Sequence, residues 1–192
     1  QFISPYKDKE VPWGPVGYVT FKRTYARRLA EFEDGAEGTE EWWQTCRHVI
    51  EGMFDIQKRH AFSIGIEWND AKAQRTAKEA YDRLFNLKWT PPGRGLWMMG
   101  TKFIYERTGA GLFNCAFRST KDLNQKGGYL YAWMMDALML GIGVGFDTLG
   151  AKTITIKEPQ WTTDILKIDD SREGWVNSVH ILLDGFLQGK KV

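Results

Sequence analysis

The chain has 192 residues, and its 26 Lys and Arg against 24 Asp and Glu give a formal net charge of +2. Because no segment holds a run of about five like charges, a nucleic-acid-binding surface is not expected. Hydrophobic residues make up 43% of the chain, which is enough for a substantial core and argues against intrinsic disorder.

The sequence shows neither a secretory leader nor a continuous apolar span of membrane length, so no membrane partner is expected. With only two cysteines, the chain fits a reducing compartment, and we expect a cytoplasmic protein. One cluster of basic residues is interpreted as a solvated helix face rather than a phosphate-binding stripe: Lys22, Arg23, Arg27 and Arg28.

The first half of the chain is predicted to be mainly helical after an extended lead-in, residues 1–20, that is rich in Pro and Gly. Helical periodicity begins at Phe21 and continues to Phe32. Thr39, followed by acidic residues, is expected to cap a second helix. Residues 71–87 are rich in straight-chain helix formers, and a short helix is expected over 103–107.

In the second half, predicted strands alternate with predicted helices. Phe113 to Arg118 is expected to be a short buried strand, and Tyr129 to Leu140 an apolar helix. Thr153 to Ile156 alternates as a strand does. Asp170 to Glu173 resembles a capping sequence for a helix that reaches Leu187, and Asp170 is a candidate for the cap itself.

A glycine-rich element, Gly141 to Gly145, follows the apolar helix. Glycines let a backbone approach a ligand closely and leave N–H groups free to bind oxygen atoms. The order of helix, glycines and strand differs from a dinucleotide-binding fingerprint, and the Lys and Ser or Thr of a P-loop are absent. The pattern alone leaves a tight packing turn and a ligand cradle equally open.

Cys115 lies among apolar residues, which by itself indicates a small buried side chain. A redox cysteine needs a partner thiol within disulfide range, and Cys46 is the only other cysteine in the sequence. A redox pair within the chain is therefore open but unsupported. The three histidines, at positions 48, 60 and 180, have no ligand spacing, so no metal site is expected.

Taken together, several segments resemble the N-terminal part of ribonucleotide reductases in their order and spacing. They are Phe21 to Arg27, Arg94 to Trp97 with Gly100-Thr101, Asn114-Cys115, Gly141 to Phe146 and Asp170 to Trp175. The first two are most similar to the adenosylcobalamin-dependent triphosphate reductases. The resemblance covers the chain from about residue 10 onward.

This resemblance implies an α/β fold: a mainly helical N-terminal region, residues 1–108, and then the first strands and helices of a ten-stranded α/β barrel in residues 109–192. In that family a thiyl radical on a finger-loop cysteine removes the 3′ hydrogen of the ribose, and two further cysteines supply the reducing equivalents. The radical cysteine and the partner cysteine lie downstream of the matched part. We therefore expect this chain to leave the barrel incomplete, to be inactive alone, and to act with a second polypeptide or a C-terminal segment.

The resemblance also implies roles for individual residues. Cys115 matches one of the two reductant cysteines, and Asp122 matches an acid that binds the effector deoxyribose in related enzymes. Five positions match residues that line the substrate site: Gly100, Thr101, Asn114, Gly143 and Gly145. The implied cofactor is adenosylcobalamin, bound mainly outside this chain. The implied partners are a ribonucleotide substrate, a deoxynucleotide effector and an external thiol reductant.

Two alternatives stay open. The chain fits the large subunit of an iron- or manganese-dependent reductase, which shares Cys115 and the glycine-rich element. It also fits a non-catalytic fragment that binds nucleotides or serves in assembly.

Overall fold

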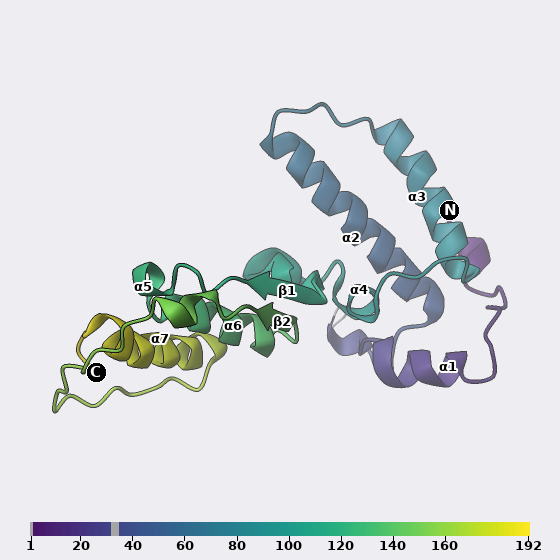
Figure 1. The fold of residues 1–192 in the computed structure, drawn as a ribbon. Helices are drawn as coiled ribbons and strands as arrows, with labels where there is room; N and C mark the ends of the chain where they lie inside the picture. Colours follow the sequence, from purple (N-terminus) through teal and green to yellow (C-terminus); the bar gives the residue numbers. More distant parts are fainter. Residues whose placement is uncertain (1, 32–34) are drawn as a thin grey trace. The chain divides into compact units, whose positions relative to one another are not determined.

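The computed structural model describes residues 2–31 and 35–192, and the chain divides into two compact units, Gln1–Leu112 and Phe113–Val192 (Figure 1). None of the helices in the described ranges is both long and apolar enough to cross a membrane.

The first unit is built on a helical hairpin of α2, Trp42–Ser63, and α3, Asp70–Phe85 (Figure 1). Helix α2 begins with a capping box, in which the Glu41 side chain accepts from the backbone of Gln44 and the Gln44 side chain accepts from the Glu41 N–H at 2.7 Å. Asn69 caps α3 by accepting from the Lys72 N–H at 2.8 Å. The hairpin supplies most of the main apolar cluster of this unit, and Phe21 and Leu96 join it from other segments. The hairpin residues of the cluster are Trp42, Cys46, Val49, Ile50, Tyr81, Leu84 and Phe85.

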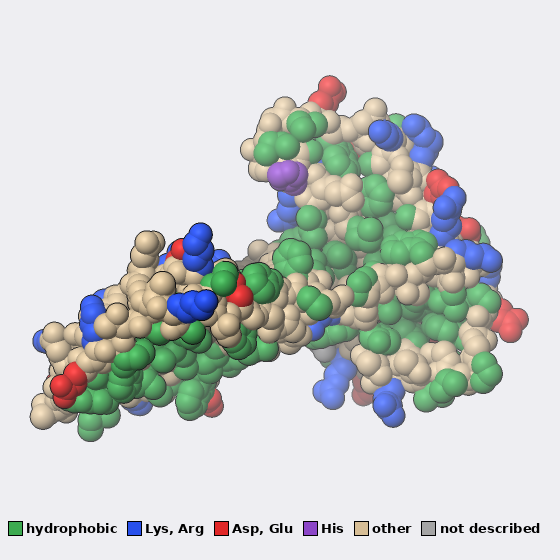
Figure 2. Space-filling model, in the orientation of Figure 1, with side chains coloured by type: hydrophobic (Ala, Val, Ile, Leu, Met, Phe, Trp, Pro, Cys, Tyr) green, Lys and Arg blue, Asp and Glu red, His purple; other side chains and the backbone are tan. Residues whose placement is uncertain are grey.

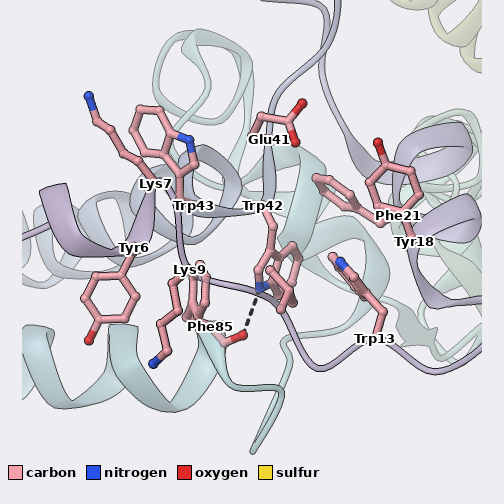
Figure 3. A pocket seen from close by; sticks show the side chains of 11 residues that line it. Tyr6, Lys7, Lys9, Trp13, Tyr18, Phe21, Glu41, Trp42, Trp43 and Phe85 are labelled. Atoms are coloured by element: carbon pink, nitrogen blue, oxygen red, sulfur yellow. Dashed lines mark hydrogen bonds between the residues drawn. The ribbon is translucent and has the colours of Figure 1, made fainter.

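Aromatic rings attach the lead-in segment to the hairpin (Figure 3). Trp13 stacks on Phe21 with ring centroids 5.5 Å apart, and it meets Trp42 edge-on at 5.1 Å. The Trp42 indole N–H donates to the Phe85 carbonyl at 3.0 Å, which satisfies its one polar group inside the core. Buried aromatic pairs of this kind therefore hold residues that are far apart in the sequence.

Short helical segments complete the first unit. They are the 3₁₀ helix Ser4–Tyr6, α1 at Gly17–Thr20, the π-helical turn Phe21–Tyr25, the 3₁₀ helix Leu29–Glu31, α4 at Gly93–Met98, the π-helical turn Phe103–Arg107 and the 3₁₀ helix Gly109–Leu112. The predicted helices over 71–87 and 103–107 are confirmed, whereas α4 was not predicted.

Three predictions for this unit are wrong. The lead-in, residues 1–20, is not extended throughout, because it contains the 3₁₀ helix Ser4–Tyr6 and α1. The helix expected over residues 21–32 begins earlier, at Gly17, and ends at Tyr25, and Phe32 lies outside the described residues. It ends there because Ala26 is extended and the next residue, Arg27, accepts at its carbonyl from the Glu40 N–H at 2.9 Å. Thr39 does not cap α2, because it forms an antiparallel bridge with Arg28.

The second unit contains a two-stranded parallel sheet with a helical crossover. Strands β1, Cys115–Arg118, and β2, Gly143–Phe146, are joined through α5, Leu123–Lys126, and α6, Tyr129–Met139. Helix α6 packs against both strands and against α7, Arg172–Gln188. A 3₁₀ helix, Leu149–Lys152, follows β2, and the core of this unit is formed by Leu123, Leu130 and Leu187.

Several expectations for the second unit need correction. The predicted apolar helix is confirmed as α6. The glycine-rich element begins with a turn at Gly141 and continues into β2 from Gly143, and Thr153 to Ile156 is irregular. The Asn124 side chain donates to the Thr153 carbonyl and accepts from the Thr155 N–H at 3.3 Å, which engages the backbone of that segment. The cap of α7 is Ser171, which accepts from the Gly174 N–H at 3.0 Å, and not Asp170.

The expected fold class is confirmed in its coarse form. The described residues form a helix-rich α/β chain with a small parallel sheet. The structure does not show the ten-stranded barrel, because the sheet in the described residues consists of β1 and β2 alone.

Candidate functional site

The two parallel strands place Cys115 beside glycines. In their register Cys115 is opposite Gly143, and Phe117 is opposite Gly145. Alternate residues of a strand face the same side of a sheet, so these four residues share one face. The strand was expected to be buried, but on this face Cys115 is exposed and the Phe117 side chain is 64% exposed.

Helix α6 covers the opposite face of the sheet. Ala116 and Val144, which are paired in the register, are half-buried on that side. The Arg118 guanidinium lies over the Trp133 ring of α6, 5.4 Å from its centroid. The sheet is therefore closed on the α6 side and open on the Cys115 side.

The packing of this chain does not require glycine at positions 143 and 145. A Cβ atom on Gly143 would lie 3.6 Å from the Asn114 carbonyl oxygen, and one on Gly145 would lie 3.6 Å from a Phe117 ring carbon, both ordinary contacts. Neither glycine has a positive φ. Glycine in a strand costs roughly 0.5–1 kcal/mol relative to alanine, and contacts within the described residues do not explain that cost.

Two neighbouring glycines, unlike Gly143 and Gly145, are required by the local structure. Gly141, which follows α6, has a φ of +77° that other residues rarely adopt. A Cβ on Gly150 would lie 2.3 Å from the Thr120 carbonyl oxygen. The glycine-rich element thus combines a turn glycine with two glycines that leave the open face bare.

Asn114 extends the pairing of the two strands by one residue, because its carbonyl accepts from the Gly143 N–H at 2.9 Å. The Asn114 side chain is exposed next to Cys115 in the sequence. The structure thus brings Asn114, Cys115, Gly143 and Gly145 together at the start of the two strands. Their roles toward a ligand stay predictions.

A hydrogen-bonded clamp joins the carboxyl ends of the same strands. The Asp147 carboxylate accepts from the Thr120 N–H at 2.9 Å, the Thr120 hydroxyl at 2.8 Å and the Leu149 N–H at 3.1 Å. Hydrogen bonds from the Ser119 side chain and the Thr120 backbone lower the pKa of Asp147 to about 2. The sequence analysis missed this clamp, although polar residues directly after two neighbouring parallel strands were the available signal.

Gly100 and Thr101 lie in the first unit. Gly100 has a φ of +73°, and a Cβ there would lie 2.8 Å from the His48 carbonyl oxygen, so the fold itself requires glycine. The Thr101 hydroxyl donates to the Met98 carbonyl at 2.8 Å at the end of α4. Contact of either residue with substrate stays a prediction.

Asp122 lies at the N-terminus of α5 in the second unit, where its carboxylate pairs with Lys126 at 3.3 Å. Its side chain is 48% exposed. A role in effector binding stays a prediction.

The two thiols differ in access. Cys46 is fully buried in α2, and burial raises the pKa of its thiol, whereas Cys115 is exposed, and both are free. Pairing Cys115 with Cys46 would thus require the core of the first unit to open.

Alkylation is expected to separate these thiols. With iodoacetamide under native conditions, we expect one equivalent to react, at Cys115, and the second to react only in denaturant. Mass spectrometry of the digested chain measures both sites. Native labelling of Cys46 at a comparable rate would contradict the buried position of that residue.

A buried network of charges lies in the first unit and was not predicted. The Glu40 carboxylate accepts from Arg27 Nη2 at 3.0 Å, from Thr45 Oγ1 at 3.2 Å and from His48 Nδ1 at 2.9 Å. Arg27 is only 8% exposed, so its interpretation as part of a solvated face is wrong. Burial alone would raise the pKa of Glu40, but hydrogen bonds from His48 and Arg27 lower it to about 2.

Within the described residues, no group of three or more His, Cys, Asp or Glu side chains is arranged to hold a metal ion.

Comparison with known proteins defines the class. The sequence model of the family described as "Ribonucleotide reductase alpha domain" matches residues 1–101, and the chain belongs to this family. A solved structure of a B12-dependent (class II) ribonucleotide reductase shares the fold, with a TM-score of 0.76 over 99% of this chain and 34% of that chain, at 24% identity.

Curated relatives narrow the similarity further. The probable adenosylcobalamin-dependent ribonucleoside-triphosphate reductase of Dictyostelium discoideum is 39% identical over 207 residues, which cover 97% of this chain and 26% of that protein. The adenosylcobalamin-dependent ribonucleoside-triphosphate reductase of Euglena gracilis is 38% identical over 187 residues, which cover 94% and 25%. The chain thus spans about a quarter of the length of these relatives.

Proposed function

We propose that this chain forms the N-terminal part of an adenosylcobalamin-dependent ribonucleotide reductase, which converts ribonucleotides to deoxyribonucleotides. The observation that carries the proposal is the open sheet face, where an exposed Cys115 lies beside two glycines that packing does not require. The names of the relatives favour cobalamin and ribonucleoside triphosphates.

In this proposal Cys115 is one of two thiols that reduce the ribose. The 2′ hydroxyl leaves as water and a hydrogen takes its place on carbon, while the two thiols give up two electrons and two protons and join in a disulfide. The second thiol, and the cysteine that carries the radical, come from the rest of the protein. An external thiol reductant then reopens the disulfide.

The substrate would lie on the open face. Gly143 and Gly145 leave room for the ribose, and the Asn114 amide supplies polar contacts beside it. The Gly100 N–H is proposed to hold a ribose or phosphate oxygen, and the Thr101 hydroxyl, whose hydrogen goes to the Met98 carbonyl, is proposed to accept from a ribose hydroxyl. Asp122 is proposed to bind the deoxyribose of an effector nucleotide.

The remainder of a ten-stranded barrel is proposed to cover the open face and the edges of the sheet. Figure 2 shows hydrophobic side chains gathered on the unit that holds α7. The exposed large hydrophobic side chains of this unit include Phe113, Phe117, Phe146, Leu149, Trp161 and Ile165. Apolar surface and unpaired strand edges of this kind need a partner. We propose that this partner is a second polypeptide, or a further segment, whose sequence matches the other three quarters of the relatives. We call this chain together with that partner the complete reductase.

Adenosylcobalamin would supply the radical chemistry when bound. We propose, from the resemblance to the adenosylcobalamin-dependent reductases, that the cofactor is held mainly outside this chain. The residues of this chain act on the substrate side. We also propose that the helical N-terminal region ends at residue 108 and that the barrel begins at residue 109. The protein is proposed to be cytoplasmic.

The large subunit of an iron- or manganese-dependent reductase is the second candidate, because it would use the same Cys115 and glycines. A requirement for a separate radical-generating subunit in place of adenosylcobalamin would favour it. A non-catalytic nucleotide-binding fragment would tolerate loss of the Cys115 thiol, whereas a reductase would not.

Gly145→Ala tests the substrate role of the open face. The added methyl meets Phe117 at an ordinary distance of 3.6 Å, so we expect the stability of the chain to hold or to rise by at most about 1 kcal/mol. In the complete reductase the methyl would occupy space needed by the ribose, so we expect kcat/KM to fall at least about tenfold. Urea unfolding and steady-state kinetics measure the two effects.

Gly150→Ala is the matched control, since its methyl would lie 2.3 Å from the Thr120 carbonyl oxygen and should destabilise the fold. If a stable Gly145→Ala enzyme kept the wild-type kcat/KM, the substrate would not bind on this face of the sheet.

A further inference from the structure

His48 connects the buried network to the segment Leu96–Thr101. Its Nδ1 lies 2.9 Å from the Glu40 carboxylate, and its Nε2 lies 2.7 Å from the Leu96 carbonyl oxygen in α4. The side chain is only 12% exposed. One imidazole ring therefore links the start of α2 to α4, across 48 residues of sequence.

The two hydrogen-bond partners of the His48 ring are both acceptors. A carboxylate and a carbonyl oxygen only accept hydrogen bonds, so each contact forms when the ring nitrogen that faces it carries a hydrogen. The charged groups that face the ring are Glu40 and, through the same carboxylate, Arg27. The Thr45 hydroxyl completes the carboxylate's contacts at 3.2 Å.

The backbone of the same residue fixes the other end of the segment. A Cβ on Gly100 would lie 2.8 Å from the His48 carbonyl oxygen, and one on Gly52 would lie 2.6 Å from the Gly100 nitrogen. Two glycines thus let the chain after α4 lie directly against α2. The next residue, Thr101, is tied back to α4 by its hydroxyl bond to Met98.

We infer that His48 is a positioning residue, which holds Leu96–Thr101 so that the Gly100 N–H and the Thr101 hydroxyl are presented to the substrate in one fixed geometry. The inference rests on the proposed function, because it takes these two groups as substrate ligands. His48 itself touches no substrate in this account, so its loss should weaken substrate binding more than the chemical step.

The test is made in the complete reductase with three variants at this position. His48→Ala removes both links, and we expect KM for the ribonucleoside triphosphate to rise about tenfold while kcat stays within about twofold. His48→Gln can still reach the Leu96 carbonyl with its amide nitrogen and should restore most of the binding. His48→Asn is too short to reach Leu96 and should behave as His48→Ala does.

Hydrogen exchange supplies a readout that does not depend on activity. We expect amides in Leu96–Thr101 to exchange faster in His48→Ala than in the wild-type protein without substrate, and His48→Gln to restore their protection. His60→Ala is the matched control, because His60 is an exposed histidine on the same helix. Val49→Ala removes fully buried methyl groups from α2 and reports general loosening of the core.

The outcomes separate this inference from the proposed function. If the wild-type assembly does not reduce ribonucleotides, the proposed function fails, while the exchange result still decides whether His48 holds the segment. Unchanged exchange in His48→Ala would overturn the inference. It would also be overturned by an equal rise in KM for Val49→Ala, or by a fall in kcat with KM unchanged.

Discussion

Cys115→Ser is expected to reduce multiple turnover by the complete reductase to background while nucleotide binding persists. A serine hydroxyl is close to a thiol in size, but it cannot form the disulfide that takes up two electrons in each cycle. The side chain lies on the exposed face of β1, so we expect no loss of fold. Product formation is measured by chromatography, and binding by calorimetry.

Cys46→Ala is the matched control for this prediction. Cys46 is fully buried, and burial raises the pKa of its thiol, so it is unsuited to thiolate chemistry. We expect Cys46→Ala to turn over normally, with a modest loss of stability. Full multiple turnover by Cys115→Ser would favour the non-catalytic, nucleotide-binding interpretation instead.

Glu40→Gln is expected to lower the free energy of unfolding by about 3 kcal/mol. The carboxylate is the counter-charge of Arg27 and a hydrogen-bond partner of His48, at a site where its side chain is only 4% exposed. The amide keeps the shape but leaves the buried Arg27 guanidinium without a negative partner, and its NH₂ group faces hydrogen-bond donors. Urea unfolding of the chain at neutral pH measures the loss.

The stabilisation by the Glu40 carboxylate should depend on pH. The folded-state pKa of Glu40, about 2, is below its ordinary value of 4.5, so its stabilisation is present above about pH 4.5 and is lost as the pH falls toward 2. The difference in stability between wild type and Glu40→Gln should therefore shrink over that window.

Glu51→Gln is the control, because its pair with Arg47 is exposed and should contribute less than about 1 kcal/mol. A difference between wild type and Glu40→Gln that stays constant from pH 7 to about pH 2 would show that the carboxylate charge does not stabilise the fold.

The order of the elements could be predicted where local signals were strong. The apolar run of α6, the helix formers of α3 and the motif around Asn114-Cys115 are all contained in short windows of sequence. The pairing of Cys115 with Gly143 could not be predicted, because strand register depends on a partner that follows only after the intervening helix. For the same reason the sequence leaves the glycine-rich element open between a tight packing turn and a ligand cradle, and it does not predict the strand over Gly143–Phe146.

Long-range polar contacts were the least predictable part of the chain. Arg27 lies in a basic cluster that suits a solvated face, whereas the structure buries it in contact with Glu40, 13 residues later. His48 reaches Leu96 across 48 residues, which no periodicity indicates. Thr153 to Ile156 has the alternation of a strand, but the Asn124 side chain engages its backbone.

The most direct test of the proposed function is the cofactor requirement of the complete reductase. The assembly is incubated with ribonucleoside triphosphates and a dithiol reductant, with and without adenosylcobalamin, and deoxyribonucleoside triphosphates are measured. We predict product only when adenosylcobalamin is present and Cys115 is intact. Absence of product with the cofactor, or reduction that needs an iron- or manganese-containing subunit instead, would contradict the account.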